Sequence, residues 1–249
     1  MLHAITFDLW DTLVVDDGDE PARAAQGLPP KPEARLRAFA AEVRAHHPHI
    51  PDEAARAALD AANARFKVAW RLHHRTPHLA DRLRDAFGQL GIDPTPGFDT
   101  LVDHIAGMEV RTPPPPTPGV AAMLASLHGR YPLGIVSDAI VTPGAQLREL
   151  LERHDLLRYF STFVFSDEVG AAKPDPAVFH AAAAGLGVSV QGIVHIGDRE
   201  ANDIAGPAAA GARSVLYTGA VDRGASNTQA DAVCHDWAAL ADTLAALET

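Results

Sequence analysis

The stretch AITFDLWDTL, residues 4–13, decides the fold class. Its first part, Ala4 to Trp10, is rich in β-branched and aromatic residues, and polar residues and a glycine follow it closely. A short apolar run of this kind predicts a buried strand that ends in a loop. The strand places Asp8 near its carboxyl end, where the side chain can leave the sheet.

From residue 119 to the end, apolar runs of strand length alternate with stretches at helical spacing. Strands that alternate with helices predict parallel crossover units, with helices on both faces of the sheet. The fold class is therefore α/β, a Rossmann-like parallel sheet flanked by helices. The later strands are expected at YPLGIVS (131–137), TFVFS (162–166), GIVHIGD (192–198), SVLYT (214–218) and DAVCH (231–235).

Between residues 30 and 110 the apolar residues recur only at helical spacing, so this part is expected to be entirely helical. The acidic stretch Val15 to Pro21 and the proline run TPPPPTPG (112–119) are interpreted as the two linkers, because proline cannot continue a helix. We expect a core of residues 1–16 and 112–249 and an inserted helical domain of residues 17–111. An amphipathic insert also offers a face for a homodimer.

The composition is that of an ordinary globular protein, with 47% hydrophobic and 21% charged residues in 249. A net charge of -11 disfavours a nucleic-acid partner and favours a small-molecule substrate. Cys234 is the single cysteine, which excludes an intrachain disulfide and favours a cytoplasmic location. No apolar stretch is long enough to predict insertion into a membrane. Cys234 is not expected to have a functional role.

Four stretches place a polar side chain at or beyond the carboxyl end of an expected strand. They are TFDLWDTL with Asp8, GIVSDA with Ser137, GAAKPDP with Lys173, and IGDREAND with Asp198 and Asp203. Each residue alone has a structural explanation as a cap, a turn former or a surface lysine. These structural explanations do not account for why all of them fall at strand ends. The carboxyl ends of parallel strands meet at one edge of a sheet, where ligands bind.

In this order, the four stretches resemble the motifs of the haloacid dehalogenase (HAD) superfamily of hydrolases. The resemblance covers nearly the whole chain and points to the subgroup with a helical cap inserted after the first strand. It implies that Asp8 is the nucleophile, that Ser137 hydrogen-bonds the transferred group and that Lys173 steadies nucleophile and substrate. It also implies a Mg²⁺ site made by Asp8, the backbone carbonyl of Trp10, Asp198 and Asp203.

The residue types fit phosphoryl transfer on their own terms. A carboxylate is a competent nucleophile toward phosphorus, and a dication and an ammonium offset the repulsion between two anions. Carboxylates, water and substrate oxygens are the ligands that Mg²⁺ prefers. The leading hypothesis is therefore a Mg²⁺-dependent phosphatase that acts on a small phosphorylated metabolite through an aspartyl-phosphate intermediate.

Trp10 departs from the pattern of the family's phosphatases, which carry a second Asp at this position as the general acid and base. Such a group is typically worth about 10² to 10⁴ in rate. The family's dehalogenases carry an aromatic residue here, and a halide leaving group needs no proton. Trp10 itself is interpreted either as a packing aromatic or as a platform for the substrate.

Other residues near Trp10 or in the helical insert are candidate sources of the proton. Asp11 is interpreted first as a turn former, and His73, His74 and His78 first as a surface cluster, although imidazoles suit proton transfer. Trp70 is expected in the core of the helical insert. Asp138 is expected to shape the turn beyond its strand.

Two alternatives to the phosphatase remain open at this stage. One is a hydrolase of the 2-haloacid dehalogenase type, which Trp10 favours and the retained pair Asp198 and Asp203 disfavours. The other is a catalytically weak binding or regulatory protein that keeps the fold and the metal, because fold does not dictate function.

Overall fold

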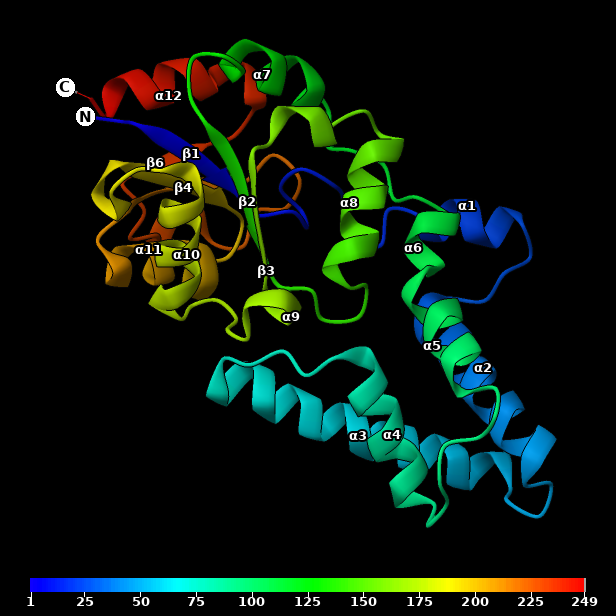
Figure 1. The fold of residues 1–249 in the computed structure, drawn as a ribbon. Helices are drawn as coiled ribbons and strands as arrows, with labels where there is room; N and C mark the ends of the chain where they lie inside the picture. The colour runs from blue at the N-terminus through cyan, green and yellow to red at the C-terminus, as the bar shows by residue number, and fades with distance from the viewer. Residues whose placement is uncertain (249) are drawn as a thin grey trace.

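The computed structural model describes residues 1–248 and contains a single six-stranded parallel sheet (Figure 1). The strand order is β3-β2-β1-β4-β5-β6, so the first strand lies at the centre. The α/β fold expected from the sequence is confirmed. The strands are β1 (Ala4–Phe7), β2 (Leu133–Ser137), β3 (Thr162–Phe165), β4 (Ile193–Gly197), β5 (Arg213–Tyr217) and β6 (Ala232–Cys234).

Helices cover both faces of the sheet, as alternation along each buried strand requires. Ile5 and Phe7 belong to a hydrophobic cluster with α7 (Val120–Leu127), α8 (Gly144–Arg153) and α12 (Leu240–Ala246). Ala4 faces the other way, into a cluster with α10 (Pro176–Leu186) and α11 (Ala205–Ala210). Figure 1 shows these two groups of helices on opposite sides of the sheet.

Short helical segments complete the sheet-bearing part of the chain. One of them, η3, is a π-helical segment that follows the fourth strand and carries Asp203. These segments are α9 (Ser166–Val169), η1 (Leu157–Tyr159), η2 (Val190–Gly192), η3 (Glu200–Ile204), η4 (Ala225–Asn227) and η5 (Trp237–Ala239).

Six helices lie between β1 and α7, and we call them the helical region. They have a hydrophobic cluster of their own, which includes Phe39, Phe87 and Ile105. The helices are α1 (Glu20–Ala25), α2 (Lys31–His46), α3 (Asp52–His73), α4 (Leu79–Gln89), α5 (Phe98–Ala106) and α6 (Met108–Arg111). The linker interpretation of Val15 to Pro21 was too long, since α1 begins at Glu20 and proline is tolerated in a first helical turn.

A buried lysine joins the two ends of the helical region. The Nζ of Lys31 lies 2.8 Å from Asp19, 3.0 Å from Asp17 and 3.3 Å from Glu109. Asp17 and Asp19 precede α1, and Glu109 lies in α6 just before the chain returns. The lysine therefore ties the outgoing and returning segments to each other.

The C-terminal end of α3 lies over the carboxyl edge of the sheet. The backbone N–H of Ala172 donates to the carbonyl of His74 at 2.7 Å. The hydroxyl of Thr76 donates to that of Ser166, also at 2.7 Å. These contacts place the helical region against the edge of the sheet that carries the predicted site, where α3 lies beneath α9 in the view of Figure 1. Among the helices of residues 1–248, none has the length and apolar character needed to cross a membrane.

Candidate active site

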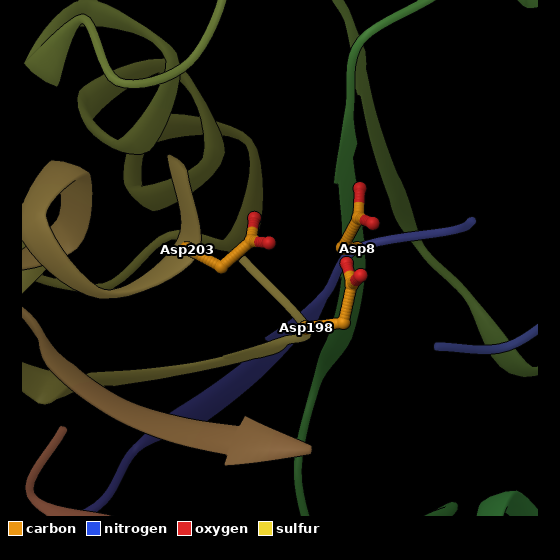
Figure 2. Close-up of side chains that lie close together, drawn as sticks. All are labelled: Asp8, Asp198 and Asp203. Atoms are coloured by element: carbon orange, nitrogen blue, oxygen red, sulfur yellow. The ribbon is translucent and has the colours of Figure 1, made fainter. Parts of the chain in front are cut away.

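Three aspartates from two neighbouring strand ends lie together at the centre of the sheet edge. Asp8 follows β1 directly, and its backbone N–H donates to the carbonyl of Ile196 in β4 at 2.8 Å. This pairing brings Asp8 beside Asp198, which follows β4, and Asp203, which lies in η3. One carboxylate oxygen from each lies within 4.8 Å of the others (Figure 2).

Lys173 neutralises two of these three carboxylates. Its Nζ lies 2.6 Å from Asp8 Oδ1 and 2.5 Å from Asp203 Oδ1, and the side chain is buried. Burial opposes the charge on this ammonium, but the carboxylates of Asp203 and Asp8 outweigh that effect and raise the pKa of Lys173 above its ordinary value. The lysine stays protonated and holds Asp8 in place.

The carboxylates are crowded, and their pKa values show it. Burial and the charges of Asp8 and Asp203 raise the pKa of Asp198 to about 7. Burial also raises the pKa of Asp8, against the opposing effect of Lys173. For Asp203 the neighbouring lysine overcomes burial, and the pKa is lowered. Carboxylates held so close favour an additional positive charge.

The donor set fits a hard divalent cation. Asp198 is fully buried, and its Oδ1 has no hydrogen-bond partner among the described residues. Three carboxylates that converge on one point are oxygen ligands of the kind that Mg²⁺ takes. An unpaired buried carboxylate oxygen is costly unless a ligand completes it.

Ser137 ends β2, the strand beside β1, and is buried. Its Oγ has no hydrogen-bond partner within residues 1–248. The hydroxyl of Ser137 is therefore free to donate a hydrogen bond to a ligand, and it lies at the end of the strand beside β1.

His195 belongs to the same cluster and was not singled out from the sequence. Its Nε2 lies 3.2 Å from Asp203 Oδ1, and its Nδ1 lies 2.9 Å from the hydroxyl of Thr6. Burial lowers the pKa of the imidazole. A polar residue inside the apolar strand GIVHIG was the signal that could have found it.

Asp11 is held as part of a turn, as its first interpretation expected. Its backbone has a φ of 51°, the left-handed conformation. One carboxylate oxygen accepts from the backbone N–H of Asp16 at 3.0 Å, and the other pairs with Arg223. Arg223 also donates to Asp198 Oδ2. Nothing in the sequence pointed to Arg223, which reaches the site from the loop between β5 and β6.

A cavity of about 230 Å³, lined by Asp8 and Asp203, lies between the sheet edge and the helical region. Trp10 lines it beside Asp8 and also packs against the hydrophobic cluster of the sheet. Trp70 was expected in the core of the helical insert, but it lines this cavity, and its Nε1 donates to Asp138 Oδ2 at 2.8 Å. An indole needs a partner for its N–H, and Asp138 supplies one at the strand edge.

Asp138 joins three elements around the cavity. Besides Trp70, it accepts from the backbone N–H of Lys173 at 3.0 Å and from Asn202 at 3.4 Å. Burial raises its pKa. The histidines His73, His74 and His78 are not among the residues that line the cavity.

The comparisons with known proteins agree with this geometry. The family model of the haloacid dehalogenase-like hydrolases matches residues 2–211. The fold and the edge of acidic side chains define a HAD-type hydrolase, and the chain belongs to the haloacid dehalogenase-like hydrolase family. The resemblance seen in the sequence is thereby confirmed at the level of the family.

Two curated relatives are phosphatases. A phosphoserine phosphatase from Thermus thermophilus is 35% identical over 108 residues, which are 43% of this chain and 41% of that protein. A phosphoglycolate phosphatase from Escherichia coli is 35% identical over 102 residues, 41% of this chain and 39% of that protein. The chain thus matches about two fifths of the length of each.

A crystal structure described as a 2-haloacid dehalogenase from Pseudomonas syringae has the same fold over the whole chain. The TM-score is 0.68 with 24% identity, and the superposition covers 99% of this chain and 100% of the other. This likeness concerns the fold alone.

Proposed function

We propose that the protein is a Mg²⁺-dependent phosphatase that hydrolyses a small phosphorylated metabolite with Asp8 as nucleophile. The observation that carries the proposal is the convergence of Asp8, Asp198 and Asp203 within 4.8 Å, with Lys173 between two of them. The phosphatases among the curated relatives support the same reaction class.

Asp8, Asp198, Asp203 and the backbone carbonyl of Trp10 would hold the Mg²⁺. When bound, the ion supplies positive charge that offsets the repulsion between the Asp8 carboxylate and the phosphoryl oxygens. The free Oδ1 of Asp198 is an available ligand atom. Arg223 takes the other oxygen of Asp198 and fixes how that carboxylate is turned.

In this proposal a carboxylate oxygen of Asp8 attacks phosphorus, and the bond from phosphorus to the ester oxygen breaks. Lys173 holds Asp8 and stabilises charge on the phosphoryl oxygens, while Ser137 donates a hydrogen bond to one of them. Water then attacks the aspartyl-phosphate, which releases phosphate and restores Asp8.

The leaving alcohol needs a proton, and Trp10 cannot donate one at the position where the family's phosphatases carry an Asp. Asp11, the next residue along the chain, is not free to replace it, because its carboxylate is engaged by Arg223 and by the backbone N–H of Asp16. We expect the enzyme to favour esters whose leaving group departs without a proton.

The helical region is proposed to be a cap domain of residues 17–111 on a core of residues 1–16 and 112–249. Its contacts over the strand ends and the cavity beneath it support this division. A cap of this kind excludes water from the reaction and selects the substrate.

A second candidate, hydrolysis of 2-haloacids, is favoured by Trp10, since halide departure needs no proton. The buried Asp198 disfavours it, because a carboxylate with a free oxygen beside two others calls for a cation. Halide release from 2-haloacids that persists in a chelator would establish this candidate.

The proposal is tested with a panel of small phosphate monoesters assayed with Mg²⁺ and with a chelator. Mg²⁺-dependent phosphate release from at least one ester is expected. If none releases phosphate under either condition, the proposed reaction is wrong.

A further inference from the structure

We propose that Arg35 and Arg82 of the helical region form a second anion-binding subsite, which recognises an anionic substituent of the substrate remote from its phosphoryl group. The substrate class is then a phosphate monoester that also carries a carboxylate or a second phosphate. This inference rests on the proposed phosphatase and names the substrates it prefers.

Arg82, in α4, is a buried cation that pairs with no acid of residues 1–248. It is 9% exposed, and its Nε has no hydrogen-bond partner among the described residues. Its other nitrogens reach neutral oxygens, the carbonyl of Ile140 and, at 3.5 Å, Oδ1 of Asn63. The guanidinium lies 3.5 Å from the centre of the Phe66 ring. A buried charge without a counter-ion is costly, so this arrangement points to an anion supplied from outside the chain.

Arg35, in α2, also has unused donors. Its side chain is 21% exposed, and its Nε has no partner within residues 1–248. Its Nη2 lies 3.5 Å from the carboxylate of Glu109. Glu109 already pairs with Lys31 at 3.3 Å and accepts from Thr142. The weak contact leaves Arg35 free to bind a ligand.

The two arginines line neighbouring cavities that share part of their walls. Arg35 lines the cavity that contains Asp8, and it also lines a second cavity of about 360 Å³, whose wall includes Arg82 and Asn63. Pro32 and Val141 line both cavities as well. Burial lowers the pKa of Arg82 to about 10, and the nearby charge of Arg35 adds to that effect. Two like charges held close together in a cavity are stabilised by an anion between them.

The acids of the second cavity do not satisfy these arginines. Glu33 lies 2.8 Å from Arg37 and 3.5 Å from Arg56. Asp60 is exposed, and it does not contribute to the shift in the pKa of Arg82. A substrate whose phosphoryl group sits at Asp8 and whose tail passes Arg35 would place its second anion between the two guanidinium groups.

The first experiment compares matched pairs of phosphate esters on the full-length protein with Mg²⁺. Phosphoglycolate and ethyl phosphate share a two-carbon skeleton and differ in the carboxylate. Propane-1,3-diol bisphosphate and propyl phosphate differ in the second phosphate. A charged hydrogen bond of the usual strength predicts that kcat/KM for the preferred anionic ester exceeds its partner by about 10- to 100-fold. The pair with the larger ratio identifies the anion.

The variants Arg35→Gln and Arg82→Gln should bring the ratio of kcat/KM between the two esters of the pair close to one. They should do so by raising KM for the ester that carries the second anion. Arg82→Lys keeps a positive charge and should retain part of the preference. Arg84→Gln, on the same helix but exposed and paired with Asp81, is the matched control and should keep the full ratio. A wild-type ratio near one in both pairs, or equal losses on both members of a pair, would overturn the subsite.

Binding separates this inference from the proposed reaction. Calorimetry on Asp8→Asn with Mg²⁺ compares the affinity for each ester that carries a second anion with the affinity for its partner, which carries the phosphate alone. If the wild type hydrolyses no ester, the phosphatase proposal fails, while tighter binding of an anionic ester that Arg35→Gln abolishes still supports the subsite. Equal affinities within both pairs overturn the subsite even if the wild type is an active phosphatase.

Discussion

Buried charges are paired with opposite charges at the edge of the sheet, whereas a buried charge of the helical region is not. At the sheet edge, Lys173 lies against Asp8 and Asp203, and Asp198 pairs with Arg223. In the helical region, Arg82 is buried, and its hydrogen-bond partners in the described part of the chain are neutral oxygens. The edge carries an excess of negative charge that fits a cation, and the helical region has free positive charge that fits an anion. The two neighbouring cavities therefore suit the two ends of one ligand.

The largest predicted effect is the loss of activity on substitution of Asp8 at the edge of the sheet. Asp8→Asn removes the nucleophile, and kcat for phosphate release should fall by at least about a thousandfold. Asp242→Asn, at an exposed position of α12, is the control and should keep normal activity. Retained turnover in Asp8→Asn would show that Asp8 is not the nucleophile.

The sequence predicted the edge far better than the helical region. A strand is recognised from a local pattern, and parallel pairing brings the strand ends together, so Asp8, Ser137, Lys173, Asp198 and Asp203 could be expected at one place. Their meeting is observed for the aspartates and the lysine.

Residues whose environment depends on packing between helices could not be foreseen. Arg35 and Arg82 look like ordinary polar residues on amphipathic helices, and only the tertiary structure removes Arg82 from solvent. The prediction for Trp70 was wrong for the same reason. The spacing of apolar residues along α3 does not indicate that the end of this helix contacts the edge of the sheet. Arg223 lies in a loop, where sequence patterns carry little information on position.

The second largest effect should be on stability. Lys173→Met leaves Asp8 and Asp203 buried without their cation, so the free energy of unfolding should fall by about 3 to 5 kcal/mol without Mg²⁺. Added Mg²⁺ should restore part of the loss, because it would bind the same carboxylates. Urea denaturation with and without Mg²⁺ measures both effects, with Lys67→Met on the exposed side of α3 as the control. A stability unchanged by the substitution would contradict the role of the ion pair.

Lys31 offers the matching test in the helical region. It also contacts several carboxylates, but the Asp17 side chain is 69% exposed, so solvent already screens part of the interaction. Lys31→Met should lower the free energy of unfolding by about 2 kcal/mol, less than the change at Lys173. The double variant Lys31→Met and Glu109→Gln should recover part of the loss, since it removes one of the acids left unpaired. A larger loss at Lys31 than at Lys173 would reverse the comparison.

The smallest effect concerns the boundary between the two regions, where Trp10 lines the cavity. Trp10→Asp introduces a carboxyl group where the family's phosphatases have their acid and base. For alkyl phosphates, whose leaving alcohol needs a proton, kcat should rise by about tenfold, below the full effect of a positioned acid because the surroundings are not arranged to hold it. For p-nitrophenyl phosphate the leaving group departs without a proton, and kcat should change little. Trp10→Phe keeps an aromatic side chain and controls for packing. If kcat for alkyl phosphates is unchanged in Trp10→Asp, another group already supplies the proton.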